Sequence, residues 1–323
     1  MSHPYEKLSP DLILDAVENA GFDVNGSLFN LNSYENRVIQ IGINDQPPVI
    51  AKFYRPQRWS DDQILEEHQF SLDLANHEIP VIAPIKLNGE TLFHHEGFRF
   101  ALFKRSGGRW PELDAAENLG WIGRFMGRIH LLGSAERFTF RPDINPETYG
   151  FDQVNWLLSS QQLPTHLKAT YQQLTSEVLA KIVAVFEQIN PFTIRLHGDC
   201  HPGNILWKED GPHFVDMDDC RNGPAIQDLW MLLSGERSEM TVQMIDLLEG
   251  YDEFASLDMR EMNMIEALRT LRMMHYASWL ARRWNDPAFP QAFPWFDSTQ
   301  YWEQHILELR EQLARMQEPV LTV

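Results

Sequence analysis

Side chains that could move a proton and bind a metal ion gather in one central stretch of the chain. Asp199 and Asn204 lie five residues apart in one loop, and Asp216 follows twelve residues later. Carboxylates packed this closely repel one another unless a cation or a raised pKa relieves them. The side-chain oxygens of Asn204 and Asp216 suit a hard ion such as Mg²⁺, which keeps waters and shares phosphate ligands. Asp199 would then accept a proton from a hydroxyl group.

The local pattern around these residues predicts a strand, a polar loop and two short strands joined by a tight turn. Apolar residues run up to Leu196, and glycine and proline then break any regular element around Asp199. The two short strands are expected at Ile205–Trp207 and Phe214–Asp216, with a turn at 208–211 between them. Asp216 ends an apolar run, so its backbone is anchored while its carboxylate projects from the strand end.

The same division of labour occurs in kinases, where an Asp is the base, an Asn five residues on binds metal, and a later strand carries the metal-binding Asp. The loop here reads His197-Gly-Asp-Cys-His-Pro-Gly-Asn204 in place of the HRD form. It closely resembles the aminoglycoside phosphotransferase and choline kinase branch of the kinase-like superfamily. Within that branch nearly the whole chain resembles a bacterial Ser/Thr protein kinase. The match also includes Asn32–Val38, Lys52–Pro56, Gln63–Phe70 and Asn222–Trp230.

This resemblance implies a kinase-like two-lobe α+β fold. A small antiparallel β N-lobe is expected over residues 1–103, and a larger, mostly helical C-lobe over residues 104–323. The C-lobe is expected to hold the catalytic loop 197–204 and the metal-binding loop 216–219. The implied reaction transfers the γ-phosphoryl group of ATP to a hydroxyl, with Asp199 as the base and Asp216 as the second catalytic residue. Mg²⁺ would be held by Asn204 and Asp216.

Local signals independently predict a small antiparallel sheet with two helices in the first third of the chain. Ser9-Pro10 opens a helix that Gly21 ends, and a capping box at Ser60–Gln63 starts a helix to about Asn76. The first helix is expected to pack across the back of the sheet. The expected strands lie near 26–31, 36–43 and 49–54. Two or three more are expected after the second helix, with a hairpin turn at Asn88-Gly89 and one strand at 98–103.

Helical patterns dominate after Lys104–Gly108, a segment with the composition of a hinge. Helices are expected near 119–133, 151–160, 166–189, 225–234, 241–255, 259–284 and 298–316. We expect the central loop and its two short strands to lie within this helical half.

Lys52 is the predicted contact to the nucleotide phosphates. It shares its strand face with Ile50 and Tyr54, so its ammonium points along an apolar surface, which indicates a buried partner. The resemblance makes it the lysine that pairs with the α- and β-phosphates. Its ion-pair partner should come from the following helix, with Glu67 preferred over Glu66, because adjacent helical positions point about 100° apart.

The nucleotide site is expected to include the loop Asn32–Asn36 and the hinge. Kinases place a glycine-rich lid at this loop, but the loop here contains no glycine. The hydroxyl of Ser33 and backbone N–H groups would have to bind the phosphates, and an ordinary polar hairpin is the alternative. Adenine would lie near Phe103 and Lys104.

Three further aspartates extend the central acidic cluster. Asp218 could approach a second metal ion or form plain hydrogen bonds, and Asp219 is expected to support the loop. Asp228 begins a helix, where the equivalent Asp of kinases accepts hydrogen bonds from the backbone of the catalytic loop. We favour that structural role for Asp228.

A transition-metal site is the rival interpretation of His197 and His201. An H-x-x-x-H pair binds metal when a helix places both rings on one face. Glycine and proline between and after these residues disfavour a helix. We therefore expect His197 to hold the shape of the loop through backbone hydrogen bonds.

Other side chains of the chain admit both a functional and a structural interpretation. The aromatic residues from Trp279 to Phe296, with Asp286 and Asp297 nearby, could form a wall or cage for a small cationic acceptor, but a packing seam is commoner. Cys200 and Cys220 lie beside the proposed catalytic and metal residues. Nearby carboxylates raise a thiol's pKa, so we interpret both as inert small apolar residues.

Composition limits the classes of function that this chain can have. The net charge of −19 argues against a protein that binds duplex nucleic acid by neutralising phosphates. No apolar run of about 18 residues is present, the start lacks the pattern of a signal peptide, and two cysteines do not make a disulfide scaffold. A cytoplasmic monomer without membrane contact is the expectation.

The sequence is therefore compatible with three functions. The first is a Ser/Thr protein kinase acting in stress response, with acceptors that could include this chain's own hydroxyls. The second is a kinase of a small molecule such as an amino alcohol or aminoglycoside. The third is a nucleotide-binding regulator without turnover, which retention of the full Lys, Asp, Asn, Asp set disfavours.

Overall fold

The computed structural model describes residues 3–323, which form two compact units. The first unit comprises the residues up to Pro111 together with Pro202–Asp219, and the second comprises Glu112–His201 and Cys220–Val323. The division after residue 103 stays a prediction. The short hairpin after the central loop, however, belongs to the first unit and not to the helical half, where we expected it.

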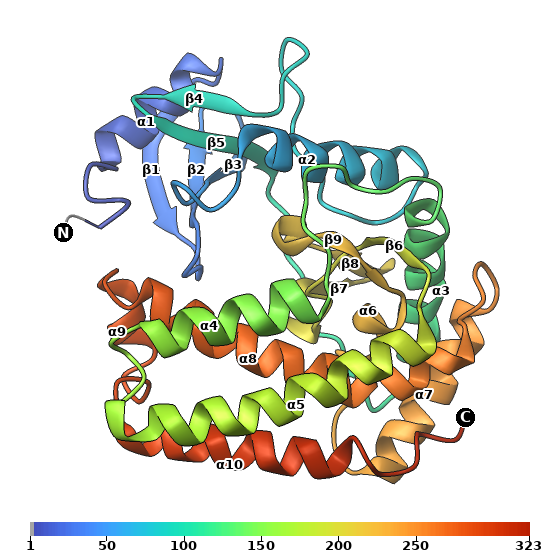
Figure 1. The fold of residues 1–323 in the computed structure, drawn as a ribbon. Coiled ribbons are helices and arrows are strands. Elements are labelled where there is room, and N and C mark those ends of the chain that lie inside the picture. The colour runs from blue at the N-terminus through green and yellow to red at the C-terminus, as the bar shows by residue number, and fades with distance from the viewer. Residues whose placement is uncertain (1–2) are drawn as a thin grey trace. The chain divides into compact units, whose positions relative to one another are not determined.

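The first unit contains a five-stranded sheet in which neighbouring strands are antiparallel (Figure 1). Its order is β1-β2-β3-β5-β4, so β3 lies between β2 and β5. The strands are β1 (Val24–Asn30), β2 (Arg37–Ile43), β3 (Gln46–Phe53), β4 (Phe93–His95) and β5 (Phe98–Lys104). The predicted hairpin turn at Asn88-Gly89 is present, and both residues have a positive φ, as such two-residue turns require.

Two helices pack on opposite faces of this sheet. Alternate residues of a strand point to opposite faces. Phe100 and Leu102 share a core with helix α1 (Pro10–Asn19), whereas Ala101 packs with Ile64 of helix α2 (Asp61–Asn76). Both predicted caps are confirmed: the Ser9 side chain caps α1, and a complete capping box starts α2.

This alternation of side chains fixes the face of the sheet on which the Lys52 side chain lies. Lys52 of β3 pairs across the sheet with Ala101 of β5, so the two side chains share a face. Ala101 packs on the face that α2 covers. The strand period therefore directs Lys52 toward α2, as the sequence pattern predicts.

The hairpin of β7 (Ile205–Lys208) and β8 (Gly211–Phe214) completes the first unit. Its turn lies at the predicted position and closes at Gly211, whose φ is +102°. Phe214 N donates to the carbonyl of Pro80 at 2.7 Å, and Ile82 N donates to the carbonyl of Phe214 at 3.1 Å. These backbone bonds explain why the hairpin belongs to the first unit.

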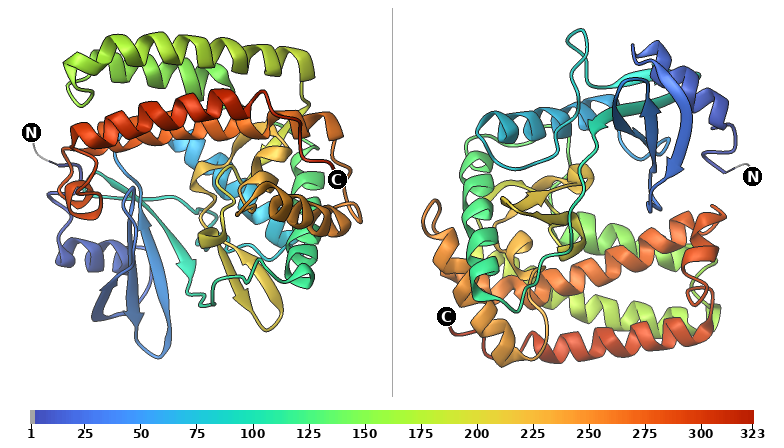
Figure 2. Two further views of the ribbon diagram at one scale, coloured as in Figure 1. Left: turned by 90° about the horizontal axis from the view of Figure 1, so that it is seen from below. Right: turned by 180° about the vertical axis from the view of Figure 1, so that it is seen from behind.

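The second unit is mainly helical. Helices α4, α5, α8 and α10 lie side by side (Figures 1 and 2). The helices are α3 (Ala116–Gly133), α4 (Asp152–Ser159), α5 (Lys168–Ile189), α6 (Ile226–Trp230), α7 (Arg237–Tyr251), α8 (Ile265–Arg283), α9 (Ala288–Ala292) and α10 (Thr299–Arg315). A two-stranded antiparallel sheet joins β6 (Thr193–Leu196) to β9 (Arg221–Pro224). None of the helices formed by residues 3–323 is long and apolar enough to cross a membrane.

Close approach of α3 and α7 depends on glycine. A Cβ atom on Gly127 would lie 2.6 Å from the carbonyl oxygen of Tyr251, and one on Gly123 would overlap the carbonyl oxygen of Leu247. Any larger residue would force the two helices apart. This packing matters for the site because α3 carries His130 and α7 carries Tyr251, two side chains that support the central loop.

Candidate active site

Lys52 is the centre of a buried ionic cluster in the first unit. Its Nζ lies 3.0 Å from Asp216 Oδ1, 3.2 Å from Asp218 Oδ1 and 3.6 Å from Glu67 Oε1. Burial alone would lower the pKa of Lys52, but these three carboxylates hold it well above its ordinary value. The predicted ion pair is confirmed for Glu67, the first of the two candidates.

Arg58 is a second cation of this cluster, and the sequence analysis missed it. Its guanidinium is bound to the Asp218 carboxylate and lies 2.7 Å from Asp219 Oδ1. Both aspartates are thus engaged in ion pairs within the protein, which favours the hydrogen-bonding alternative for Asp218 over a second metal site. The signal that could have revealed Arg58 is its position, six residues after Lys52 in the connection to α2.

The loop between β1 and β2 is held by an arginine and an asparagine instead of by glycines. Asn36 is buried, donates to Asp218 Oδ2 at 3.2 Å and accepts from Arg55 N at 3.1 Å. Arg55 Nε also donates to the carbonyl of Glu35 at 3.0 Å. Ser33 Oγ donates to the carbonyl of Asn36 at 3.2 Å, so its hydroxyl bonds within the loop. Its phosphate contact stays a prediction.

Asp216 is held in an unusual backbone conformation. Its φ is +58°, in the left-handed region that non-glycine residues adopt at a cost of about 1–3 kcal/mol and that is enriched at functional sites. Val215 N donates to the carbonyl of Asn204 at 3.0 Å, which ties the two proposed metal-binding segments together. The Asp216 side chain is 55% exposed despite its contact with Lys52. It is therefore both anchored and accessible.

The charges of this cluster suit a divalent cation. Five carboxylates face three basic side chains, which leaves a formal excess of two negative charges. These eight residues are Glu35, Lys52, Arg55, Arg58, Glu67, Asp216, Asp218 and Asp219. The accessible carboxylate of Asp216 and the amide oxygen of Asn204 are the hard donors that Mg²⁺ prefers. The residues present therefore fit the proposed metal.

Asp199 belongs to the second unit, because the division falls between His201 and Pro202. Its Oδ1 lies 2.5 Å from Arg272 Nη1, and its Oδ2 lies 3.6 Å from His201 Nε2. Asp199 N donates to His197 Nδ1 at 3.4 Å, and His197 is fully buried. The predicted role of His197 in holding the loop through a backbone hydrogen bond is confirmed. Arg272 of α8 was not anticipated.

Asp228 anchors the start of the central loop. Its two carboxylate oxygens accept hydrogen bonds from His197 N and Gly198 N, each at 2.8 Å. His130 Nε2 lies 3.2 Å from Asp228 Oδ2, and His130 Nδ1 lies 2.9 Å from the hydroxyl of Tyr251. The predicted structural role of Asp228 is confirmed, and His130 and Tyr251 extend it to the packing of α3 on α7.

The transition-metal interpretation finds no support in the structure. Residues 197–201 form no helix, so the two histidines do not share a helical face. Among residues 3–323, no group of three or more His, Cys, Asp or Glu side chains is arranged to hold a metal ion. The proposed Mg²⁺ site is of a different kind, because it consists of one carboxylate and one amide.

The aromatic residues between Trp279 and Phe296 pack mainly against one another. The Trp279 ring lies 5.0 Å from that of Phe289 and 5.9 Å from that of Phe293, both edge to face. Asp286 is buried and accepts a hydrogen bond from Ala288 N at 3.1 Å. These contacts favour the packing seam over a cage for a cation.

Phe103 packs beside a buried apolar group, and the two cysteines are buried. Phe103 packs against the buried group that contains Tyr54 and Ala101, and its contact with adenine stays a prediction. Cys200 and Cys220 are both buried and unoxidised. Burial, followed by Asp228 and Asp199, raises the pKa of Cys200 well above its usual value, which makes the thiol a poor nucleophile.

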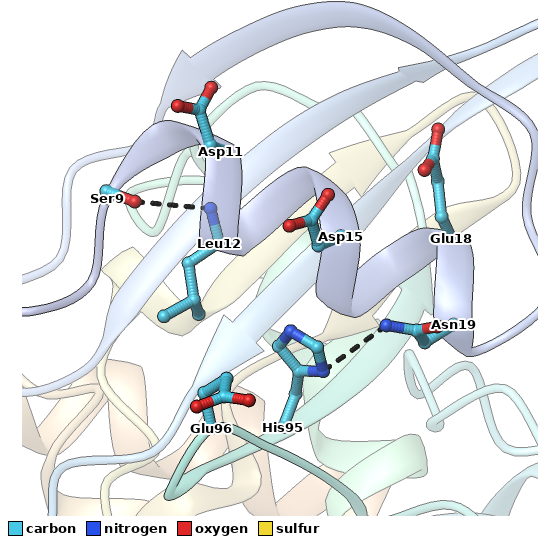
Figure 3. A pocket seen from close by; sticks show the side chains of 8 residues that line it. All are labelled: Ser9, Asp11, Leu12, Asp15, Glu18, Asn19, His95 and Glu96. Atoms are coloured by element: carbon cyan, nitrogen blue, oxygen red, sulfur yellow. Dashed lines mark hydrogen bonds between the residues drawn. The ribbon is translucent and has the colours of Figure 1, made fainter.

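A hollow of about 460 Å³ lies elsewhere in the first unit, between α1 and the turn that joins β4 to β5 (Figure 3). His95 and Asn19 point toward one another there, with 3.4 Å between His95 Nδ1 and Asn19 Nδ2 (Figure 3). The hollow is rich in carboxylates, but it shares no residue with the Lys52 cluster. Its lining consists of Ser9, Asp11, Leu12, Asp15, Glu18, Asn19, His95 and Glu96. We assign it no part in the chemistry.

The chain belongs to the phosphotransferase enzyme family, whose family model matches residues 29–265. It is 46% identical over 318 residues to stress response kinase A of Escherichia coli O157:H7, a match that covers 98% of this chain and 96% of that protein. It is 45% identical over 317 residues to the serine/threonine protein kinase RdoA of Salmonella typhimurium, with the same coverage. The resemblance stated from the sequence is thereby confirmed.

The fold agrees with this family. The structure of amicoumacin kinase hAmiN in complex with AMP-PNP and Ca²⁺ superimposes with a TM-score of 0.72 at 18% identity. The superposition covers 94% of each chain. The predicted kinase-like α+β fold, with an antiparallel sheet and a larger helical part, is confirmed. The protein is a phosphotransferase.

Proposed function

We propose that this phosphotransferase is an ATP-dependent Ser/Thr protein kinase that acts in stress response. The observation that carries the proposal is the ion pair of Lys52 with Glu67, together with the contact of the same ammonium with Asp216. Kinases need a lysine held by a helix glutamate and a metal-binding aspartate nearby. The names of the relatives, stress response kinase A and serine/threonine protein kinase RdoA, support the acceptor and the physiological role.

Each residue has a defined task in the proposed reaction. Lys52, oriented by Glu67, binds the α- and β-phosphates of ATP, and the loop that contains Ser33 covers them. Asp199 accepts the proton of the acceptor hydroxyl as the phosphoryl group is transferred. Asp228 fixes the backbone that carries Asp199.

Binding of Mg²⁺ by Asn204 and Asp216 would supply positive charge that offsets the charge of the phosphates. Adenine would lie beside Phe103, at the end of β5. The proposal also includes a cytoplasmic location and a monomeric state. These two parts rest on the sequence alone.

The test is a transfer assay with γ-labelled ATP, the purified protein and a mixture of acceptors. A generic protein substrate is offered beside an amino alcohol and an aminoglycoside, and the protein's own label is measured separately. Asp199→Asn serves as the inactive variant, and Asp252→Asn, at an exposed position of the second unit, serves as the matched control.

We expect label in protein Ser or Thr residues with the wild type and with Asp252→Asn, but not with Asp199→Asn. Label that enters only the amino alcohol or the aminoglycoside would assign the protein to the small-molecule kinases. Binding of ATP without label in any acceptor would favour the regulator without turnover.

A further inference from the structure

Helix α8 is basic, although the protein as a whole is acidic. The whole chain has a net charge of −19, yet α8 contains four arginines and a single carboxylate, Glu266. Arg269 lies over the Trp230 ring and pairs with Glu266, and Arg282 lies over the Trp156 ring. Within an acidic protein, this helix is therefore a distinctly basic element.

Arg272 places a positive charge of this helix beside Asp199, the proposed catalytic base. It lies one turn of the helix beyond Arg269, and its guanidinium forms the ion pair with Asp199. The Arg272 side chain is 35% exposed and that of Asp199 is 23% exposed, so the pair is accessible to an acceptor. His201 lies beside the other oxygen of Asp199. The segment 197–204 contains no lysine or arginine of its own, so α8 supplies the cation.

A fixed cation beside the base discriminates between acceptors by charge. An acceptor that carries an ammonium group would meet a like charge next to the oxygen that must receive its hydroxyl, and like charges placed together are unfavourable. An acceptor with carboxylates near its hydroxyl would meet an opposite charge instead. The aromatic rings that could otherwise stabilise an ammonium pack against one another around Trp279.

We propose that Arg272 determines acceptor specificity: it favours Ser or Thr hydroxyls flanked by acidic residues and disfavours acceptors that carry an amine. This inference rests on the proposed function, because it specifies the acceptor at the same base. It runs against the net charge of the chain, which by itself would attract basic ligands. The local charge at Asp199 decides the preference.

The experiment measures peptide binding separately from transfer. Two fluorescent peptides of equal length carry one Ser flanked by either Asp or Lys residues, and their Kd values are measured by anisotropy. The proteins are the wild type, Arg272→Gln, Arg272→Lys and Arg124→Gln. Arg124 is the matched control, because it forms an exposed ion pair with Glu253 in the same unit. Circular dichroism checks the fold of each variant.

The wild type, Arg272→Lys and Arg124→Gln should bind the acidic peptide about tenfold more tightly than the basic one. Arg272→Gln should lose this preference. Equal binding of both peptides by the wild type, tighter binding of the basic peptide, or a preference retained in Arg272→Gln would overturn the proposal. Transfer of label from ATP to the same peptides is scored independently, so absence of transfer with the binding preference intact counts against the kinase assignment alone.

Discussion

Lys52 and Asp216, the proposed phosphate ligand and the proposed metal ligand, lie 3.0 Å apart and neutralise one another. The contact ties the central strand of the sheet to the segment that follows the β7–β8 hairpin. The excess negative charge around it would be relieved by a divalent ion, whereas the phosphates of a nucleotide would compete with the carboxylates for the ammonium. Nucleotide and metal should therefore bind together more tightly than either binds alone.

Arg58 should be important for both stability and metal binding. Arg58→Gln removes the guanidinium bound to the buried carboxylate of Asp218, and loss of one partner of a buried ion pair costs about 3–5 kcal/mol. Asp218 keeps Lys52 and Asn36 as partners, so we expect the free energy of unfolding to fall by less than that amount. Loss of the contact that holds the metal-binding loop should raise the Mg²⁺ concentration at half-maximal activity. Denaturant titration and a Mg²⁺ titration of activity measure the two effects.

The matched control for this prediction is Arg105→Gln, at an exposed arginine of the same unit that bonds to Gln40. It should change both quantities little. Equal effects of the two substitutions would show that the Asp218 ion pair does not hold the metal-binding loop.

Asp228 should affect turnover through the position of the catalytic loop. Asp228→Asn leaves one oxygen to serve two backbone N–H groups and places an amide N–H₂ against one of them. A displacement of about 1 Å at a catalytic group lowers turnover by about 10²-fold, and we expect a loss of this size with little change in ATP affinity. Steady-state kinetics and nucleotide titration separate these quantities. A variant with weakened ATP affinity and unchanged kcat would contradict this role.

Glu261 should make the stability of the second unit depend on pH. Burial raises the pKa of Glu261 to about 7, and its Oε2 accepts from Ile226 N at 3.0 Å, at the start of the helix that carries Asp228. The unfolded chain loses this proton near pH 4.5 and the folded protein near pH 7. The folded state therefore binds more protons between these values, and stability falls as the pH rises through this window.

Glu261→Gln should remove this slope and raise the free energy of unfolding at pH 8 by on the order of 3 kcal/mol, since the pKa rises from 4.5 to about 7 and one pKa unit corresponds to about 1.4 kcal/mol. The amide oxygen of Gln can still accept the backbone hydrogen bond. Denaturant unfolding of the wild type and the variant at pH 5 and pH 8 measures the effect. Glu249→Gln, at an exposed position of α7, is the control that should leave the slope unchanged.

Sequence patterns predicted the elements that have strong local signals. The capping box at Ser60 identifies a helix start because its side chains satisfy backbone N–H groups that the helix leaves unpaired. The proline after Ser9 identifies another because it lacks the N–H that would be unpaired there. Strand alternation placed Lys52 on the correct face, and the resemblance to kinases at the start of the following helix identified Asp228 as the backbone acceptor. Helix α9 was missed, because its five residues contain an internal proline and no periodic pattern.

The unpredicted features depend on contacts between residues distant in sequence. Arg272 lies 73 positions after Asp199, and Arg58 pairs with Asp218 across 160 positions. The position of Arg58 shortly after Lys52 was a hint of a role in the site, but neither partner could be identified from local sequence. The β7–β8 hairpin joins the first unit through hydrogen bonds to residues 80 and 82, which composition could not reveal. Such long-range partners are defined only once the sheet and helices have assembled.

The most direct test of the central claim compares ATP affinity with turnover in Asp199→Asn and Asp216→Ala. Asp199 is assigned to the acceptor proton and Asp216 to the metal, so the two losses should differ in kind. Asp199→Asn should keep Mg²⁺-ATP affinity near the wild-type value while lowering turnover by about 10²–10⁴-fold. Asp216→Ala should weaken both, and Asp210→Asn, at the exposed turn of the nearby hairpin, should change neither. Near-normal turnover of Asp199→Asn, or equal ATP affinity in the Asp199 and Asp216 variants, would contradict the account.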